Sequence, residues 1–180
     1  MNGTEKAPLA KPEGHLCFAC GTANPIGLNM TFYRDGEHVC SEVALGRYHV
    51  GWEKVAHGGI IFTLLDEVMS WTVMYWKKAF FVTRKMDVKY VRNVPIEVPL
   101  TVCGRILDDS QPPKVRARAE IRDGRGALFV RAHGEFVLLE RDQLHIMPEQ
   151  QQRQMLELFE RFEQDCDAGT TLQGFAVKTV

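Results

Sequence analysis

The sequence lacks an excess of charge of either sign. Its 180 residues include 22 basic and 23 acidic residues, so the formal net charge is −1. Proteins that bind nucleic acid or anionic membranes usually carry a clear positive excess. The charge balance therefore indicates neither partner, and it leaves room only for a local basic patch that binds a phosphorylated ligand.

The sequence also lacks a long apolar segment free of charges. Residues 1–12 are polar and contain no signal-peptide core. The longest apolar run, 59–76, carries Asp66 and Glu67 near its middle. Two adjacent carboxylates at that depth are too costly for a membrane helix. We therefore expect a soluble, cytoplasmic protein without a membrane partner.

Cysteines are few, and their number is odd. The five are Cys17, Cys20, Cys40, Cys103 and Cys166. Without a secretory signal, an odd number favours reduced thiols. Cys17 and Cys20 form a C-x-x-C pair near His15, His38 and Cys40, and such a set could supply four zinc ligands. A second C-x-x-C pair is missing, however, so we expect no metal and no cofactor, and we interpret the two thiols as small side chains that fill space.

The apolar pattern predicts an α+β fold. Residues 28–33 and 39–45 indicate two strands joined by a turn, and 46–56 indicates a loop. The run from Gly58 to about residue 78 is too long for a strand and is apolar almost all round, which predicts a helix buried on most sides. A single helix of this kind needs an antiparallel sheet that curls round it. The remaining strands are expected at 80–91, 99–107, 114–122 and 127–139.

The residues after the last strand predict a different helix, 148–166. Met155, Phe159 and Phe162 recur at the spacing of one helix face, and the other face is rich in Gln, Glu and Arg. We expect this helix to dock on the domain or on a partner subunit. The chain then divides into a flexible tail (1–14), a main domain (15–140), and a C-terminal helix and tail (141–180).

Two glycines, Gly58 and Gly59, stand where the long helix begins. The first amides of a helix have no partner within the helix and carry the positive end of its dipole. Glycine also lets a carbonyl group approach the backbone closely. The pair therefore suits an oxyanion hole, although a tight turn explains the glycines equally well. His57, just before them, either hydrogen-bonds an acyl oxygen or shapes the turn.

Asp66 stands inside the apolar helix. Burial disfavours a charged carboxylate and raises its pKa towards the range of a general base. The alternative is an interfacial Asp that hydrogen-bonds a neighbouring backbone. Glu67 lies about 100° further round the helix, so only one of the two carboxylates faces a given site, and the residues alone do not decide which. Thr83, in the next strand, could orient a water molecule, although most strand threonines have no such role.

Gly59 and Asp66 are separated by seven helical steps, or roughly 10 Å. One reacting carbonyl carbon does not reach both ends of that distance. If both groups act, they come from two subunits whose helices run antiparallel across a two-fold axis. The sequence therefore predicts a dimer with two equivalent sites.

Several segments resemble the PaaI-like acyl-CoA thioesterases of the hotdog-fold superfamily. Residues 49–52 (HVGW) and 57–67 (HGGIIFTLLDE) are similar to the central motif of that family. Residues 17–28 (CFACGTANPIGL) resemble the segment that opens the domain, and Thr83 with 87–95 resembles the strand after the helix. The likeness covers about 15–139.

The resemblance implies a curved sheet round one helix, a homodimer that is often doubled to a homotetramer, and acyl-CoA substrates. By position, Asp66 matches the family's base or nucleophile, and Gly58 matches its oxyanion amide. His57 matches the histidine beside the acyl group, and Thr83 matches the residue that positions water. The resemblance thus selects Asp66 over Glu67 for catalysis. The residues assigned to substrate binding are Gly59, His49, Trp52 and Glu67.

One loop departs from the family pattern. Some members carry an Asn or Gln in the loop before the H-G-G motif, where it helps to bind the thioester or water. This chain has Val50 and Gly51 there, so His49 is the polar residue that could take over that contact.

The leading functional hypothesis is hydrolysis of an acyl-CoA to a free acid and CoA. The alternative is a non-catalytic acyl-CoA-binding module, as in lipid-responsive regulators. Such regulators need a DNA-binding helix-turn-helix, and the sequence shows no basic recognition helix. A hotdog hydratase is disfavoured because no segment resembles its Asp/His signature.

Overall fold

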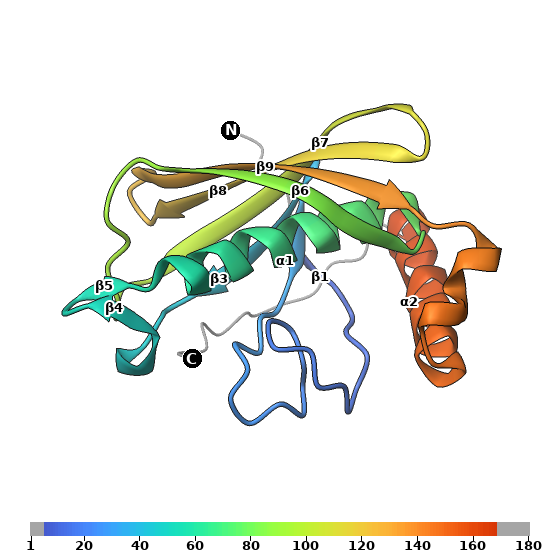
Figure 1. Ribbon diagram of the computed structural model, residues 1–180, viewed down its shortest axis with the longest axis horizontal. Helices are drawn as coiled ribbons and strands as arrows, with labels where there is room; N and C mark the ends of the chain where they lie inside the picture. Colours follow the sequence, from blue (N-terminus) through green and yellow to red (C-terminus); the bar gives the residue numbers. More distant parts are fainter. Residues whose placement is uncertain (1–5, 169–180) are drawn as a thin grey trace.

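One long helix, α1 (Gly58–Lys77), packs against one face of a curved antiparallel sheet (Figure 1). The computed structural model describes residues 6–168. Every pair of neighbouring strands in this sheet is antiparallel. The expected α+β arrangement, a sheet round one helix, is confirmed. Across the sheet the strands follow the order β1 (Ala7–Pro8), β2 (Tyr33–Asp35), β3 (His38–Val43), β7 (Leu100–Gln111), β8 (Lys114–Asp123), β9 (Leu128–Leu138) and β6 (Phe81–Tyr90).

α1 forms over the span that the apolar run predicts. His57 precedes it with an extended backbone and caps it, because its side chain accepts a hydrogen bond from the Gly59 N–H. Lys78 ends it in the left-handed conformation, with its N–H bonded to the Met74 carbonyl at 2.9 Å. Residues 71–75 are all buried, so this part of the helix is covered all round. Within residues 6–168, no helix has both the length and the apolar character that a membrane span needs.

The backbone of α1 lies directly against β7 at Gly104. A Cβ atom there would lie 2.5 Å from Thr72 Oγ1 and 3.1 Å from the Val68 carbonyl oxygen. Thr72 is fully buried, and its hydroxyl donates to that same Val68 carbonyl at 2.7 Å. On β9, a Cβ atom at Gly134 would lie 3.1 Å from Met69 Cε. Two strand glycines therefore set how closely the helix approaches the sheet.

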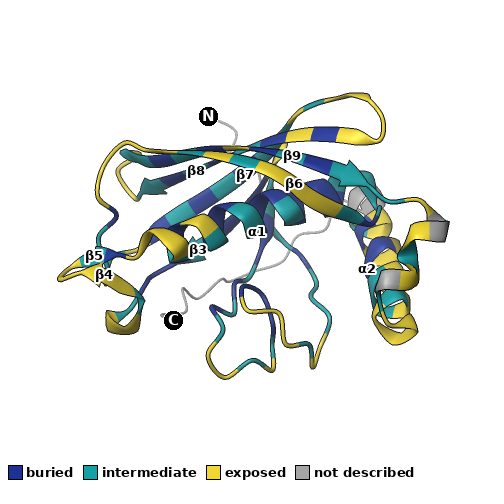
Figure 2. Cartoon of the chain, viewed as in Figure 1, coloured by how far each residue is buried: buried dark blue, intermediate teal, exposed yellow. Residues whose placement is uncertain are grey.

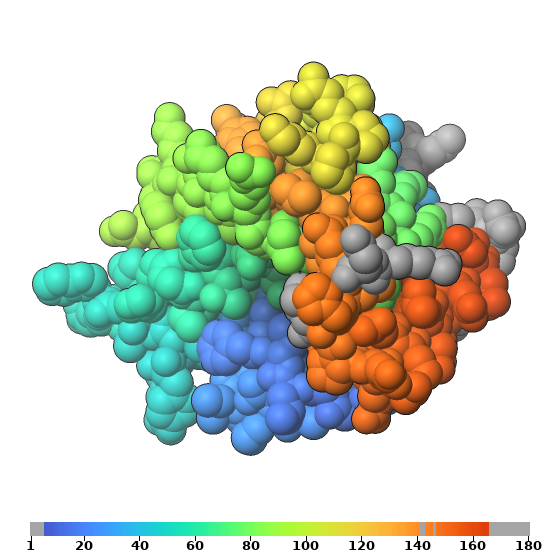
Figure 3. Space-filling view, turned by 45° about the vertical axis from the view of Figure 1, so that its right-hand side comes forward, coloured from blue at the N-terminus to red at the C-terminus, as the bar shows by residue number. Residues whose placement is uncertain are grey.

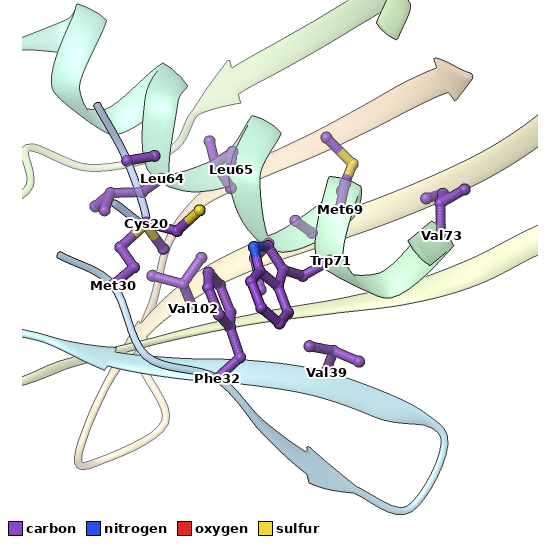
Figure 4. Packing of buried hydrophobic residues seen from close by; sticks show 14 of the residues in the cluster. Cys20, Met30, Phe32, Val39, Leu64, Leu65, Met69, Trp71, Val73 and Val102 are labelled. Carbon is purple, nitrogen blue, oxygen red and sulfur yellow. The ribbon is translucent and has the colours of Figure 1, made fainter. Parts of the chain in front are cut away.

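Trp71 connects α1 with the N-terminal segment. Its ring stacks on Phe32, with ring centroids 4.2 Å apart, and Met30 and Cys20 lie nearby (Figure 4). Phe162 contacts the Trp71 ring edge-on, with a centroid distance of 6.1 Å. Residues from both ends of the described chain therefore share one core with the central helix.

A second helix, α2 (Glu149–Ala168), follows the 3-10 helix η2 (Arg141–Ile146) and docks near the end of α1. Leu158, Phe159 and Phe162 are buried. Phe159 packs edge-on against Phe80, with ring centroids 5.4 Å apart. Figure 3 shows α2, in orange, beside the N-terminal segment, in blue. The sequence predicts that this helix docks either on its own domain or on a partner subunit. The structure shows contact with its own domain.

The strand expected at 28–33 is largely absent from the sheet. Leu28 and Met30 are buried, as the alternating pattern indicates. Their backbone N–H groups, however, donate to the carbonyls of Phe18 and Ala19, at 2.7 and 2.9 Å. The segment thus pairs with the N-terminal loop, and only the short strand β2 continues into the sheet.

Two segments expected to be irregular contain strands. Within the expected tail 1–14, β1 pairs with β2. Within the expected loop 46–56, the 3-10 helix η1 (Arg47–His49) leads into a hairpin of β4 (Val50–Trp52) and β5 (Val55–Ala56). Both strands are short and depend on partners that no local pattern reveals. The tail expected at the C-terminus lies, from residue 169 onwards, outside the described residues.

Cys40 and Cys103 form a disulfide that joins β3 to β7. They are register partners in adjacent strands although they are 63 residues apart in sequence. The expectation of reduced thiols throughout is therefore wrong for this pair, because strand register, and not cysteine count, brings the two together. The disulfide also removes one argument for the expected cytoplasmic location, because that argument relied on reduced thiols. Cys17 and Cys20 are free thiols.

β6 forms one edge of the sheet, and its outer side is open in a single chain. Most of its residues are exposed, including Val82 and Tyr90 (Figure 2). An edge strand presents backbone N–H and C=O groups that can pair with a strand from another chain. This edge therefore suits contact with a second copy.

A side chain added at Gly104 should loosen the helix from the sheet. We expect Gly104→Ala to lower the free energy of unfolding by about 1–3 kcal/mol, because the new methyl group overlaps Thr72 and the α1 backbone. Thermal or urea unfolding measures the change. The control is Gly124→Ala, because a Cβ atom at Gly124 meets nothing within 4 Å. Equal stability of the two variants would contradict the close helix–sheet contact.

Candidate active site

The first backbone amide of α1, that of Gly58, has no partner in the described chain. His57 Nδ1 accepts a hydrogen bond from the Gly59 N–H at 3.0 Å, so the Gly59 donor is engaged. Among residues 6–168, no acceptor is bonded to the Gly58 N–H. That amide also lies at the positive end of the helix dipole. Gly58 therefore has a donor to offer to a bound oxyanion.

The hairpin before α1 is held by histidine contacts. The His57 N–H donates to the His49 carbonyl at 2.8 Å, and His49 Nδ1 accepts from the Gly46 N–H at 3.0 Å. Trp52 is 84% exposed on this hairpin, which projects in cyan in Figure 3. Within one chain His49 thus shapes the loop, and Trp52 has few contacts.

Asp66 lies on the side of α1 that faces β6. Thr83 Oγ1 donates to Asp66 Oδ1 at 3.1 Å. Burial raises the pKa of the Asp66 carboxyl, whereas the Thr83 hydrogen bond acts in the opposite direction. Thr83 lies where the pairing of β6 with β9 shifts register, between Thr83 and Lys85, and such irregularities often redirect a side chain beside a site. The structure therefore brings together Asp66 and Thr83, two of the residues that the sequence singled out.

Glu67 points to a different part of the molecule. Trp71 Nε1 donates to Glu67 Oε1 at 2.9 Å, and a Glu67 carboxylate oxygen lies within 4.8 Å of the sulfurs of Cys17 and Cys20. Burial first, and then the neighbouring Cys17, raise the pKa of the Glu67 carboxyl to about 7. The two adjacent carboxylates therefore have different hydrogen-bond partners, Thr83 of β6 for Asp66 and Trp71 for Glu67.

Tyr90 is a residue near the site that sequence reasoning did not single out. Its hydroxyl donates to the Gly58 carbonyl at 2.9 Å. A Cβ atom at Gly58 would lie 3.5 Å from that hydroxyl oxygen. The contact joins residues 32 positions apart, so no local spacing could have indicated it. β6 therefore contacts α1 at two places, Thr83 near the middle of the helix and Tyr90 at its start.

Gly58 and Asp66 remain far apart within one chain. α1 is continuous over Gly58–Lys77, so eight helical steps separate them by about 12 Å. A single carbonyl group cannot contact both the Gly58 amide and the Asp66 carboxylate of the same helix. One chain thus places the Gly58 amide and the Asp66 carboxylate at different heights of the helix.

Residues 53–108, which contain α1 and β6, match the family model named Thioesterase superfamily. Over this segment the chain is similar to that family. The match includes Gly58, Asp66 and Thr83. Among curated proteins, no sequence matches the chain.

Solved structures of thioesterase superfamily proteins share the fold. One such protein is 25% identical over 66% of this chain, with a TM-score of 0.62, and this chain spans 61% of its length. Zebra fish thioesterase superfamily member 2 is 17% identical over 69% of this chain and 91% of its own, with a TM-score of 0.58. A Streptococcus mutans protein bound to acetyl CoA is 20% identical over 62% of this chain and 89% of its own, with a TM-score of 0.55. The expected hotdog-like fold is confirmed.

The contact between Thr83 and Asp66 predicts a measurable pKa change. In Thr83→Val the carboxylate loses a donor that favours its charged form, so the pKa of Asp66 should rise. An NMR titration of the labelled Asp66 carboxyl carbon measures it. The control is Thr101→Val, which removes from β7 a hydroxyl that donates to Glu42 of β3. This variant should leave the Asp66 titration unchanged. A pKa that is unchanged or lower in Thr83→Val would show that the hydrogen bond does not act on Asp66.

Proposed function

We propose that the protein hydrolyses an acyl-CoA thioester to the free acid and CoA. The observation that carries the proposal is the partly buried Asp66 on α1, hydrogen-bonded by Thr83, within a segment that matches the thioesterase superfamily. Hotdog-fold structures bound to coenzyme A and to acetyl CoA support the choice of substrate class. The PaaI-like resemblance of the motifs supports the same activity.

The proposed reaction uses three groups of the chain. The Gly58 N–H donates to the thioester oxygen and stabilises the negative charge that develops there. Asp66 either takes a proton from the attacking water or attacks the carbonyl carbon itself, in which case water then hydrolyses the acyl–Asp66 anhydride. The C–S bond breaks, and CoA leaves as a thiolate that then takes up a proton. Thr83 orients the carboxylate or the water.

The site is proposed to form between two chains. Gly58 and Asp66 of one α1 are too far apart to act on one carbonyl, whereas two antiparallel helices would bring Gly58 of each chain towards Asp66 of the other. The exposed edge β6 supports pairing of this kind. His57 and Gly59 then line the acyl oxygen side, and His49 and Trp52, on the exposed hairpin, are available to CoA or to the partner chain. The assembly is a homodimer, which can double to a homotetramer.

Replacement of Asp66 tests the proposed activity. Asp66→Asn should lower kcat by at least about 100-fold, because the base or nucleophile is lost, and should keep the affinity for acyl-CoA near that of the parent. Thiol release from a panel of acyl-CoAs of varied length gives the rate, and calorimetry with the best substrate gives the affinity. The control is Asp109→Asn, which changes a carboxylate that pairs with Lys77.

The outcomes separate two functions. If the parent protein releases no thiol from any acyl-CoA but binds one of them, the chain is an acyl-CoA-binding module. If Asp66→Asn hydrolyses as fast as the parent, Asp66 is not the catalytic carboxylate.

A further inference from the structure

Three side chains with metal-binding atoms converge beside α1, on the side away from Thr83. One sulfur each from Cys17 and Cys20 and one carboxylate oxygen from Glu67 all lie within 4.8 Å of one another. Tetrahedral zinc holds sulfur at about 2.3 Å and oxygen at about 2.0–2.2 Å, which places its ligand atoms roughly 3.5–4 Å apart. The three atoms are therefore close to the spacing that one ion would impose.

A histidine lines the same pocket, although its ring nitrogens lie outside the group of atoms within 4.8 Å of one another. His15 lines it together with Cys17, Cys20 and Glu67. Its Nε2 atom is buried and has no hydrogen-bond partner in the described chain. Buried polar atoms are nearly always bonded, so an orphaned ring nitrogen needs a reason. A metal ion satisfies such a nitrogen, because neutral imidazole is a common zinc ligand.

The loop that carries the thiols has the geometry of a ligand turn. The Gly21 N–H donates to the Cys17 carbonyl at 2.9 Å and closes the turn that carries both thiols. A Cβ atom at Gly21 would lie 2.4 Å from the Cys17 carbonyl oxygen, so only glycine fits here.

A hydrogen bond from Trp71 orients the Glu67 carboxylate. Trp71 Nε1 donates to Glu67 Oε1 at 2.9 Å, and the Trp71 ring is fixed by stacking on Phe32. Metal-binding carboxylates usually have such an orienting hydrogen bond. A disulfide between Cys17 and Cys20 would be the simpler use of two near thiols, but it would leave the His15 nitrogen unsatisfied.

We propose that His15, Cys17, Cys20 and Glu67 bind one zinc ion, which joins the N-terminal loop to α1. Two thiolates, an imidazole and a carboxylate favour zinc over the hard cations magnesium and calcium. Cys17, Cys20 and Glu67 supply three ligands, and His15, at the same pocket, would complete a closed tetrahedral site by a turn of its side chain. Because Glu67 follows Asp66 directly, the ion would hold the segment of α1 that carries the proposed catalytic carboxylate. The proposal goes beyond acyl-CoA hydrolysis, and its tests do not depend on that activity.

The first test is the metal content of the full chain. Protein purified in reducing buffer without chelators should contain about one zinc per chain by mass spectrometry and should keep it against a weak chelator. Cobalt added to the zinc-depleted protein should give the intense near-ultraviolet absorption of cobalt–thiolate bonds. The thermal midpoint should rise when zinc is restored.

Single variants assign the ligands. Cys17→Ser, Cys20→Ser, His15→Ala and Glu67→Gln should each reduce zinc retention by tenfold or more, and the two serine variants should weaken the cobalt–thiolate band. The matched controls are the exposed His38→Ala and Glu163→Gln, which should retain zinc as the parent does. Circular dichroism identifies any variant that does not fold. If a ligand variant does not fold, the cobalt–thiolate absorption of the parent decides whether the thiols bind metal.

Two results would overturn the proposal. One is a parent chain that holds less than a tenth of an equivalent of zinc and shows no cobalt–thiolate band. The other is folded ligand variants that retain as much zinc as the two controls, which would mean an adventitious ion only.

Discussion

The contact between the backbone of α1 and Gly104 of β7 fixes which way each side chain on the helix points. Val68 and Thr72 face this glycine at distances that leave no room for a methyl group, so the helix cannot rotate about its axis without a clash. Successive residues of a helix are about 100° apart. Glu67 therefore points to one flank of the contact, towards the N-terminal loop, and Asp66 points further round, towards β6. One packing contact gives two neighbouring carboxylates different surroundings and, in our proposals, different roles.

The parts of the fold with a local signal could be predicted from the sequence. The apolar run predicts α1 to within one residue at its C-terminal end, and the spacing of Phe159 and Phe162 predicts the buried face of α2. The choice between Asp66 and Glu67 could not be made from residue types, because it depends on how the helix is rotated against the sheet. The disulfide and the contact of Tyr90 with α1 depend on strand register over 63 and 32 residues, which no local pattern contains.

In the proposed mechanism, a single chain holds complementary parts of the active site but not a complete one. Its helix start offers the Gly58 amide, its helix middle offers Asp66, and about 12 Å separates them. The exposed edge β6 carries Thr83 and Tyr90, the two residues that touch these pieces. The surface on which a second chain would pair is thus the surface that carries the proposed catalytic groups, so assembly and catalysis are coupled in the proposed mechanism.

Subunit mixing tests whether one site uses Asp66 of one chain and the Gly58 N–H of another. The partners are Asp66→Asn and Gly58→Pro, since proline suits the first position of a helix and removes its amide hydrogen; Gly58→Ala keeps that hydrogen and is the control. Asp66→Asn alone and Gly58→Pro alone should each be nearly inactive, whereas Gly58→Ala should keep its activity. After subunit exchange at equal proportions, mixed dimers should contain one intact site, which restores about a quarter of the wild-type rate. A mixture no more active than its separate components would contradict a site shared between chains.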